Sequence, residues 1–331
     1  MGAQISAISY IFPKNKITNE NLQKEFPDYN FSKFEKKVGI LNRYVVEKGE
    51  TALGLATEAC EKLFHLIDKN NIDFLLYCTQ SPEYFLPTTA CLLAKNLKLP
   101  IGIGALDYNL GCSGYTYGLS LAKGLIESGQ VKNVLLVTAE TYSKYINPKD
   151  KSNRAIFGDA ASATLITTSE QNYISQILFG TNGDGAEHLI VKNGCSYPYD
   201  PEANEIVYGT DNIYTDNDLY MNGPEIFRFT TEQIPNFVLS ILNNQNLEIN
   251  DVDQYIFHQA NSFLLNQIRI KLNIPKERFY INLADGGNTV SSTIPIALKR
   301  YLDQNQSSSS RKIMLVGFGV GLSWSGGIIT I

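Results

Sequence analysis

The sequence is poor in the residues that bind metals, cross-link chains or attract nucleic acid. Only three histidines occur in 331 residues, and they show no metal-ligand spacing, so a metal site has little support. The five cysteines include no C-x-x-C pair, which favours reduced thiols in a reducing compartment. The net charge of -5 gives no support for a nucleic-acid binder.

Uninterrupted apolar segments are also lacking. The N-terminus, Met1-Gly2-Ala3-Gln4, has no basic region followed by an apolar one, so we expect no signal peptide and a cytoplasmic protein. Residues 313–331 form the most apolar stretch, but five glycines and Ser323-Trp324-Ser325 interrupt it. Two buried strands joined by a glycine loop explain this stretch better than a spanning helix, so we expect no membrane association.

The chain carries an internal repeat. Residues 72–80 and 252–259 both read as buried strands, and each follows an amphipathic helix. Each half then has a strand, a glycine-rich turn, a helix rich in small residues and a final apolar strand. The corresponding pairs are helices 55–69 and 232–243, strands 4–11 and 173–179, strands 105–109 and 279–283, helices 113–128 and 291–303, and strands 134–137 and 313–316.

This alternation predicts two α/β halves with largely parallel sheets, divided into 1–168 and 169–331. We expect the helices at 113–128 and 291–303 to lie centrally between the two sheets. The region 184–220 is rich in Asn, Asp, Gly and Tyr and breaks the pattern. It is predicted to be a long loop or cap over the site.

Cys112 is the candidate nucleophile. It lies in Asn109-Leu110-Gly111-Cys112-Ser113-Gly114, between an apolar stretch and a helical segment. A helix N-terminus favours negative charge, so this position predicts a stabilised thiolate, and the flanking glycines leave room for a substrate. The other cysteines are interpreted as structural; they are Cys60, Cys78, Cys91 and Cys195.

His258 and Asn288 are the candidate partners of Cys112 in the second half. His258 follows the apolar run Tyr255-Ile256-Phe257, and Asn288 lies in Asp285-Gly286-Gly287-Asn288-Thr289. A neutral imidazole and an amide can both donate hydrogen bonds to a carbonyl oxygen that becomes negative during a reaction. Each residue alone fits a structural role, as a core histidine or a turn residue, but together with Cys112 they predict a catalytic set.

The segment Gly317-Phe318-Gly319-Val320-Gly321 is superficially similar to a dinucleotide-binding fingerprint. Only ten residues follow it, so no helix and second strand can complete that unit. A glycine loop that presents backbone N–H groups to an oxyanion is the better interpretation.

Taken together, these motifs resemble the β-ketoacyl-acyl-carrier-protein synthase III family, within the thiolase fold. The resemblance runs from Ile5 to Ile331 and implies a five-layer αβαβα sandwich of two duplicated α/β halves. The matching motifs are the Gly-Cys-Ser-Gly turn at Cys112, residues 157–161, residues 221–227, His258-Gln259-Ala260-Asn261, Gly287-Asn288-Thr289 and residues 317–324.

The resemblance implies an acyltransferase that runs a ping-pong Claisen condensation. Cys112 takes an acyl group from a thioester carrier, and a malonyl-type thioester then loses carbon dioxide. His258 and Asn288 stabilise the enolate oxygen, and the carbanion attacks acyl-Cys112 to give a 3-oxoacyl thioester. The backbone N–H groups of Cys112 and Val320 form the implied oxyanion hole. Relatives usually have glycine where Val320 stands, so a backbone donor is kept in a changed pocket.

The resemblance also implies the partners: acyl-coenzyme A or an acyl-carrier protein as substrate, no cofactor, and a homodimer. In relatives, a segment equivalent to residues 84–88 reaches toward the neighbour's pocket. Relatives that use coenzyme A usually hold it with a tryptophan and arginines. The corresponding residues here are Lys33, Phe34, Lys37, Lys151 and Phe263, with Lys36, Arg154, Arg228, Arg269 and Lys271 as further basic candidates.

On an acidic protein, such a basic cluster favours an acidic carrier protein over free acetyl-coenzyme A as the acyl donor. Scattered solvated charges are the other interpretation of the same residues. The residues do not determine the primer chain or the pathway.

Alternative functions stay open at this point. A family member that moves the acyl group from Cys112 to a hydroxyl or amine needs no decarboxylation, although the retention of His258 and Asn288 argues against it. A papain-like protease also has Cys, His and Asn in this order, but its cysteine lies close to the mature N-terminus of a secreted, disulfide-bonded chain. A non-catalytic subunit that binds an acyl carrier does not need an intact Cys112.

Overall fold

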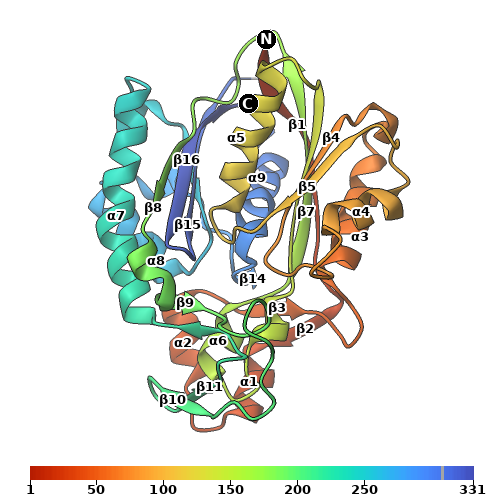
Figure 1. Ribbon diagram of the computed structural model, residues 1–331. Helices are drawn as coiled ribbons and strands as arrows, with labels where there is room; N and C mark the ends of the chain where they lie inside the picture. The colour runs from red at the N-terminus through yellow and green to blue at the C-terminus, as the bar shows by residue number, and fades with distance from the viewer. Residues whose placement is uncertain (307–308) are drawn as a thin grey trace.

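The computed structural model describes residues 1–306 and 309–331, which form two main sheets with helices between and outside them (Figure 1). Helices α3 (Ala52–Phe64) and α4 (Thr89–Leu97) cover the outer face of the first sheet, and α7 (Gly223–Asn244) and α8 (Ser262–Lys271) cover that of the second. Helices α5 (Gly114–Glu127) and α9 (Thr293–Gln304) lie between the sheets. The predicted αβαβα sandwich with two central helices is therefore confirmed.

The first sheet contains β1 (Gly2–Ile11), β7 (Ala160–Ser169), β6 (Asn133–Glu140), β4 (Phe74–Cys78) and β5 (Gly104–Tyr108), in that order. Strands β6, β4 and β5 are parallel, and β7 runs antiparallel to both of its neighbours. Helices cover both faces, so β6 is buried along almost its whole length and its sequence is apolar without alternation. The parallel strands all bring their carboxyl ends to one edge.

The second sheet contains β13 (Gln254–Phe257), β15 (Lys312–Gly319), β16 (Ser323–Thr330) and β8 (Leu178–Thr181), in that order. Strands β15 and β16 form the predicted pair of buried strands joined by a glycine loop. Strand β13 is parallel to β15, so the repeat places His258 and the end of β15 at the same edge.

Two predicted strands are wrong in extent. Residues 279–283 form only an isolated bridge between Tyr255 and Phe279, and β8 begins at Leu178 rather than at 173. In both places the backbone forms only a few hydrogen bonds, and side chains add others. The Gln259 carboxamide oxygen accepts the N–H of Asn282 at 2.6 Å, and the hydroxyl of Ser175 accepts the N–H of Ile328 at 2.8 Å.

The core between the sheets holds the two central helices in place. Leu119 and Ile126 of α5 and Ile294 and Leu298 of α9 belong to one buried cluster with residues of both sheets. Full burial of such a side chain stabilises the fold by roughly 1.5–3 kcal/mol. The turns that precede these helices, at Cys112 and Asn288, are therefore fixed relative to each other.

A smaller layer closes the lower end of the molecule in Figure 1 and was not predicted. It contains a three-stranded sheet and short helices. These elements are β2 (Asn15–Thr18), β3 (Asn42–Val45), β14 (Asp285–Gly286), α1 (Asn19–Glu25), α2 (Phe31–Val38) and α6 (Lys151–Ile156). Because β14 pairs with β3, the N-terminal half directly supports the Asn288 turn.

The region 184–220 is not the plain loop that the sequence predicted. It contains β9 (Leu189–Ile190), the hairpin of β10 (Ile206–Tyr208) and β11 (Asn212–Tyr214), and the first residue of β12 (Tyr220–Met221). Tyr208, Tyr214 and Tyr220 pack ring against ring, which stabilises the hairpin without a helix or a large sheet. Across residues 1–306 and 309–331, no helix combines the length and apolar character of a membrane span.

Candidate active site

Cys112 lies in the turn between β5 and α5 and is 5% exposed. The end of β15 packs against it. A Cβ atom added to Gly319 would lie 2.9 Å from the sulfur, so only glycine leaves the thiol its space. The backbone N–H groups of Cys112 and Val320 lie near enough to the thiol to lower its pKa. This is the geometry expected of two oxyanion donors beside a nucleophile.

The thiol of Cys112 is protonated at neutral pH in this structure. Burial raises its pKa to about 12, the charge of Glu140 raises it further, and the N–H groups of Cys112 and Val320 act in the opposite direction. Burial therefore opposes the stabilisation of the thiolate that the sequence predicted at this helix start. A helix terminus contributes up to about 2 kcal/mol in partly buried sites, and here the loss of solvent outweighs it.

His258 directly follows β13 and is 2% exposed. Its Nδ1 lies 2.7 Å from the hydroxyl oxygen of Thr293, and its ring stands edge to face against Phe318 with 5.5 Å between centroids. Burial lowers the pKa of the imidazole to about 3, and the carbonyl of Val290 acts in the opposite direction. The ring is therefore neutral at pH 7, in the charge state that the sequence predicted.

Asn288 is 5% exposed and forms a bridge with Phe157 of the first half. Its side-chain oxygen accepts the backbone N–H of Val290 at 2.9 Å. Since this bond occupies the oxygen side of the amide, the NH₂ group is the part left to face a ligand. The amide is thus oriented as a donor.

Val290 is the common neighbour of the three predicted residues. Its side chain packs in the same apolar cluster as Cys112, its N–H orients Asn288, and its carbonyl contacts the ring of His258. Its φ of +55° is unusual for a β-branched residue and costs about 1–3 kcal/mol. The structure therefore gathers Cys112, His258 and Asn288 around Val290, a strained residue that the sequence did not single out.

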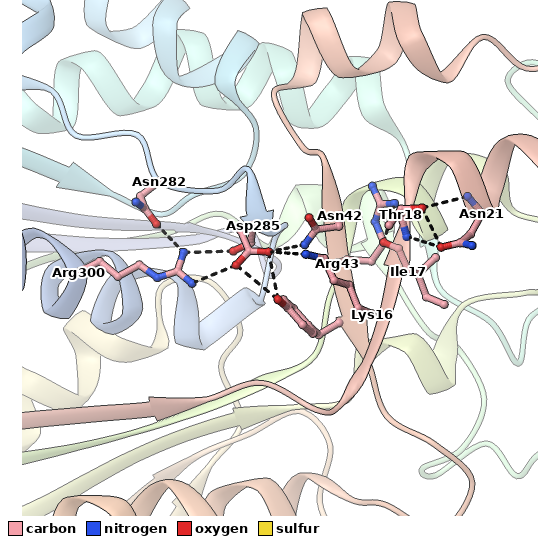
Figure 2. Close-up of polar contacts among 10 residues, drawn as sticks. Lys16, Ile17, Thr18, Asn21, Asn42, Arg43, Asn282, Asp285 and Arg300 are labelled. Carbon is pink, nitrogen blue, oxygen red and sulfur yellow. Dashed lines mark hydrogen bonds and ion pairs between the residues drawn. The ribbon is translucent and has the colours of Figure 1, made fainter.

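Asp285 anchors the turn that carries Asn288, and Figure 2 shows its polar contacts. Asn42 donates to its carboxylate at 2.5 Å and Tyr44 at 3.1 Å, both from β3, while Arg300 of α9 donates to its backbone carbonyl at 3.1 Å. Partial burial raises the pKa of Asp285, but these hydrogen bonds and the charges of Lys16 and Arg300 together lower it. The turn is thereby tied to both halves of the chain.

Glu140 at the end of β6 is a further buried group of the site that the sequence did not reveal. It is 0% exposed and accepts the hydroxyls of Ser291 at 2.8 Å and Ser81 at 3.2 Å. Burial raises its pKa to about 8. Because Ser291 lies beside the Asn288 turn and Ser81 beside Gln80, Glu140 connects the two halves behind the pocket. In the sequence, a carboxyl that ends an apolar strand looks like a surface residue.

A cavity of about 920 Å³ opens next to the pocket. Its lining includes Tyr142, Leu189 and Leu219, which also belong to the apolar cluster around Cys112. Most of the remaining wall comes from residues 186–199 and from the segment at 82–88. The region 184–220 therefore lies over the site, as its predicted role as a cap requires.

The predicted carrier-binding residues do not form one basic cluster. Phe34 is 8% exposed and packs against Phe31, so it is a core residue and its predicted place at the carrier site is wrong. The other candidates with internal contacts are Arg154 with Glu25 at 2.6 Å, Arg228 with Glu225 at 2.5 Å, Arg269 with the carbonyl of Ile274 at 3.1 Å, and Lys271 with the carbonyl of Thr231 at 3.0 Å.

Lys37 and Phe263 do come together. The Nζ of Lys37 on α2 lies 4.8 Å from the ring centroid of Phe263 on α8, and Phe227 of α7 stacks on the same ring at 5.6 Å. Lys33 and Lys36 lie on the same exposed helix as Lys37, and Lys151 lies over the ring of Tyr29 at 5.8 Å. An aromatic and basic patch thus exists, formed by Lys33, Lys36, Lys37, Lys151 and Phe263.

Comparisons with known proteins agree with this geometry. Residues 106–193 match the family model for 3-oxoacyl-[acyl-carrier-protein] synthase III, and residues 242–331 match the model for its C-terminal part. The β-ketoacyl-[acyl-carrier-protein] synthase III of Clostridium tetani is 33% identical over 96% of this chain and 95% of that protein.

Solved structures give the same result. A crystal structure of a 3-oxoacyl-(acyl-carrier-protein) synthase III is 42% identical, with a TM-score of 0.97 over all of both chains. The 3-oxoacyl-(acyl-carrier protein) synthase from Burkholderia xenovorans is 32% identical, with a TM-score of 0.92 over 100% of this chain and 94% of that one. The chain therefore belongs to the 3-oxoacyl-[acyl-carrier-protein] synthase III family.

Proposed function

We propose that this protein is a condensing acyltransferase that joins an acyl group on Cys112 to a malonyl thioester, with loss of carbon dioxide, to give a 3-oxoacyl thioester. The observation that carries the proposal is the convergence of Cys112, His258 and Asn288 on Val290. Membership of the synthase III family supports the same reaction.

The first half-reaction loads Cys112. Its sulfur attacks the carbonyl carbon of an acyl thioester, and the N–H groups of Cys112 and Val320 stabilise the negative oxygen of the tetrahedral intermediate. The bond between that carbon and the carrier sulfur then breaks. Because the resting thiol is protonated, its proton leaves during the attack and ends on the departing carrier thiol.

The second half-reaction uses His258 and Asn288. The malonyl thioester loses carbon dioxide, and the electron pair of the broken bond moves into an enolate. The amide of Asn288 and the neutral imidazole of His258 stabilise the enolate oxygen. The enolate carbon then attacks the acyl carbonyl, and the Cys112 thiolate leaves and takes up a proton.

The alternatives find no support among the relatives. The relatives named above are all synthases. Intact-mass measurement after incubation with an acyl thioester separates the enzyme from a mere binder. The expected result is one acyl group on the protein; binding of the carrier without this mass increase would contradict the proposal.

Acyl thioesters are the substrates that the family uses. We propose that the carrier of the thioester binds at the patch of Lys33, Lys36, Lys37, Lys151 and Phe263. An acidic carrier protein suits this patch because three of the lysines lie on one exposed helix face of an otherwise acidic protein. We place the enzyme in the cytoplasm, in keeping with five unpaired cysteines in the described residues.

Lys37→Ala is expected to slow Cys112 loading from an acyl-carrier protein by about tenfold at low salt, because steering by a local positive charge is lost. The difference from the native enzyme should shrink as the salt concentration rises. Lys132→Ala is the matched control, since Lys132 is exposed at the opposite, amino-terminal end of β6. Equal slowing in both variants, or salt-independent loading, would argue against this carrier surface.

The segment at 82–88 favours a homodimer. Tyr84, Phe85 and Leu86 are 59%, 76% and 83% exposed, and Leu106 on the edge strand β5 is 39% exposed. We expect a sedimenting species of about 74 kDa, twice the 36.9 kDa of the chain. Leu86→Glu should yield monomers, whereas Leu66→Glu, at a residue that is 68% exposed elsewhere, should not. A native protein that sediments only as a monomer at micromolar concentration would contradict the dimer.

A further inference from the structure

Part of the cavity wall beside the Cys112 turn is polar. The carboxamide oxygen of Gln80 lies where a Cβ on Gly111, the neighbour of Cys112, would approach it to 2.6 Å. The hydroxyl of Tyr142 donates to this oxygen, and the Gln80 NH₂ group donates to the side-chain oxygen of Asn109 at 3.0 Å. A connected row of hydrogen-bonding groups therefore begins beside the nucleophile.

Several hydrogen-bond donors and acceptors in this row have no partner among the described residues. The bonds above use one of the two amide hydrogens of Gln80 and the single hydroxyl hydrogen of Tyr142. Among the described residues, the second Gln80 hydrogen, both amide hydrogens of Asn109 and the oxygen lone pairs of Tyr142 have no protein partner. All three side chains line the cavity. Donors and an acceptor thus face a cavity that adjoins the Cys112 turn.

An alkyl chain in that space removes water from these groups and returns no hydrogen bond, which is unfavourable. A hydroxyl group matches them, because it accepts from the amide hydrogens of Gln80 or Asn109 and donates to the oxygen of Tyr142. Sites built to hydrogen-bond a substrate hydroxyl discriminate strongly against analogues without one. The opposite side of the same space, with Leu189 and Leu219, is apolar and suits the carbon skeleton.

We propose that the acyl group taken up by Cys112 is a short hydroxyacyl group, whose hydroxyl binds to Gln80, Asn109 and Tyr142. This inference rests on the proposed function, because it names the substrate of the first half-reaction. The hydroxyl lies close to the thioester, since the carboxamide of Gln80 lies beside Gly111, and Gly111 immediately precedes the nucleophile. Gln80 is the residue that gives the site its preference for a hydroxyacyl group over an unsubstituted acyl group.

The test compares two acyl groups that differ only by the hydroxyl. Cys112 loading is followed by intact mass with butyryl- and 3-hydroxybutyryl-acyl-carrier protein, the carrier proposed above, and acetyl-acyl-carrier protein serves as the reference. The native enzyme should load the hydroxyacyl group at least about tenfold faster than butyryl. Gln80→Leu, which keeps the size of the side chain and removes its amide, should reduce this ratio to about twofold or less.

Two further variants provide a second test of the hydroxyl contact and a control. Tyr142→Phe removes one hydroxyl and keeps the ring, so it should lower the ratio even if Gln80→Leu does not fold. Tyr199→Phe removes a hydroxyl from a residue that lines the same cavity but is 70% exposed, and it should keep the native ratio. Retention of acetyl loading in each variant shows that the nucleophile is intact.

Equal loading of the two four-carbon groups by the native enzyme, or faster loading of butyryl, would overturn the inference. Retention of the native ratio by both Gln80→Leu and Tyr142→Phe would overturn it as well. In either case, acetyl loading leaves the proposed function standing. A native enzyme that loads none of the three thioesters onto Cys112 refutes the proposed function and this inference together.

Discussion

Replacement of Cys112 by alanine is expected to abolish acyl loading while the fold is kept. The thiol is the proposed nucleophile of this turn, and alanine is small enough to occupy the buried position of Cys112 without displacing its neighbours. Intact-mass measurement after incubation with an acyl thioester should show no added acyl group. Circular dichroism and the thermal unfolding curve should remain close to those of the native protein.

Cys195→Ala provides the matched control, because Cys195 is an exposed cysteine that also lines the cavity. This variant should load as the native enzyme does. If Cys112→Ala still gained one acyl group per chain, or if Cys195→Ala lost it, the nucleophile would be wrongly assigned.

His258→Ala and Asn288→Ala are each expected to slow malonyl decarboxylation by about 100-fold or more, the usual cost of removing one donor from a developing oxyanion. Acyl loading of Cys112 should suffer much less, since the backbone N–H groups of Cys112 and Val320 serve that step. Decarboxylation is measured as carbon dioxide released from a malonyl thioester, and loading is measured by intact mass on the same preparation.

His188→Ala is the control for these two variants. His188 lies 3.8 Å from Glu225 and lines a cavity whose wall includes none of Cys112, His258 and Asn288, so its loss should leave decarboxylation unchanged. Normal decarboxylation by both His258→Ala and Asn288→Ala would refute the condensation. Acyl transfer from Cys112 to a hydroxyl or amine would then be the better account.

The sequence predicted the parts of the fold that the repeat specifies. The central helices and the paired strands 134–137 and 313–316 were found because buried elements need long apolar or small-residue patterns, which can be read directly. The failures at 173–179 and 279–283 have a different cause. There, backbone pairing is limited to isolated bridges, and the side chains of Ser175 and Gln259 make hydrogen bonds beside them, which strand propensity does not reveal.

The sequence identified the residues of the candidate site, but it did not predict the direction of the pKa shift at Cys112. The motifs named Cys112, His258 and Asn288, yet the sign of the shift at Cys112 depends on burial and on Glu140, which comes from a distant strand. Val290 was missed because a positive φ at a valine has no sequence signal. Phe34 was misplaced because an aromatic residue on a short amphipathic helix can face either the core or a ligand.

The most direct test of the condensation follows both products from the acylated enzyme. Acyl-Cys112 enzyme, freed of excess thioester, is mixed with a malonyl thioester, and carbon dioxide and the acyl product are quantified in a single turnover. One carbon dioxide and one 3-oxoacyl thioester per acyl-enzyme are predicted, with free Cys112 restored. Release of the acyl group from Cys112 to a hydroxyl, an amine or water, without carbon dioxide, would contradict the account.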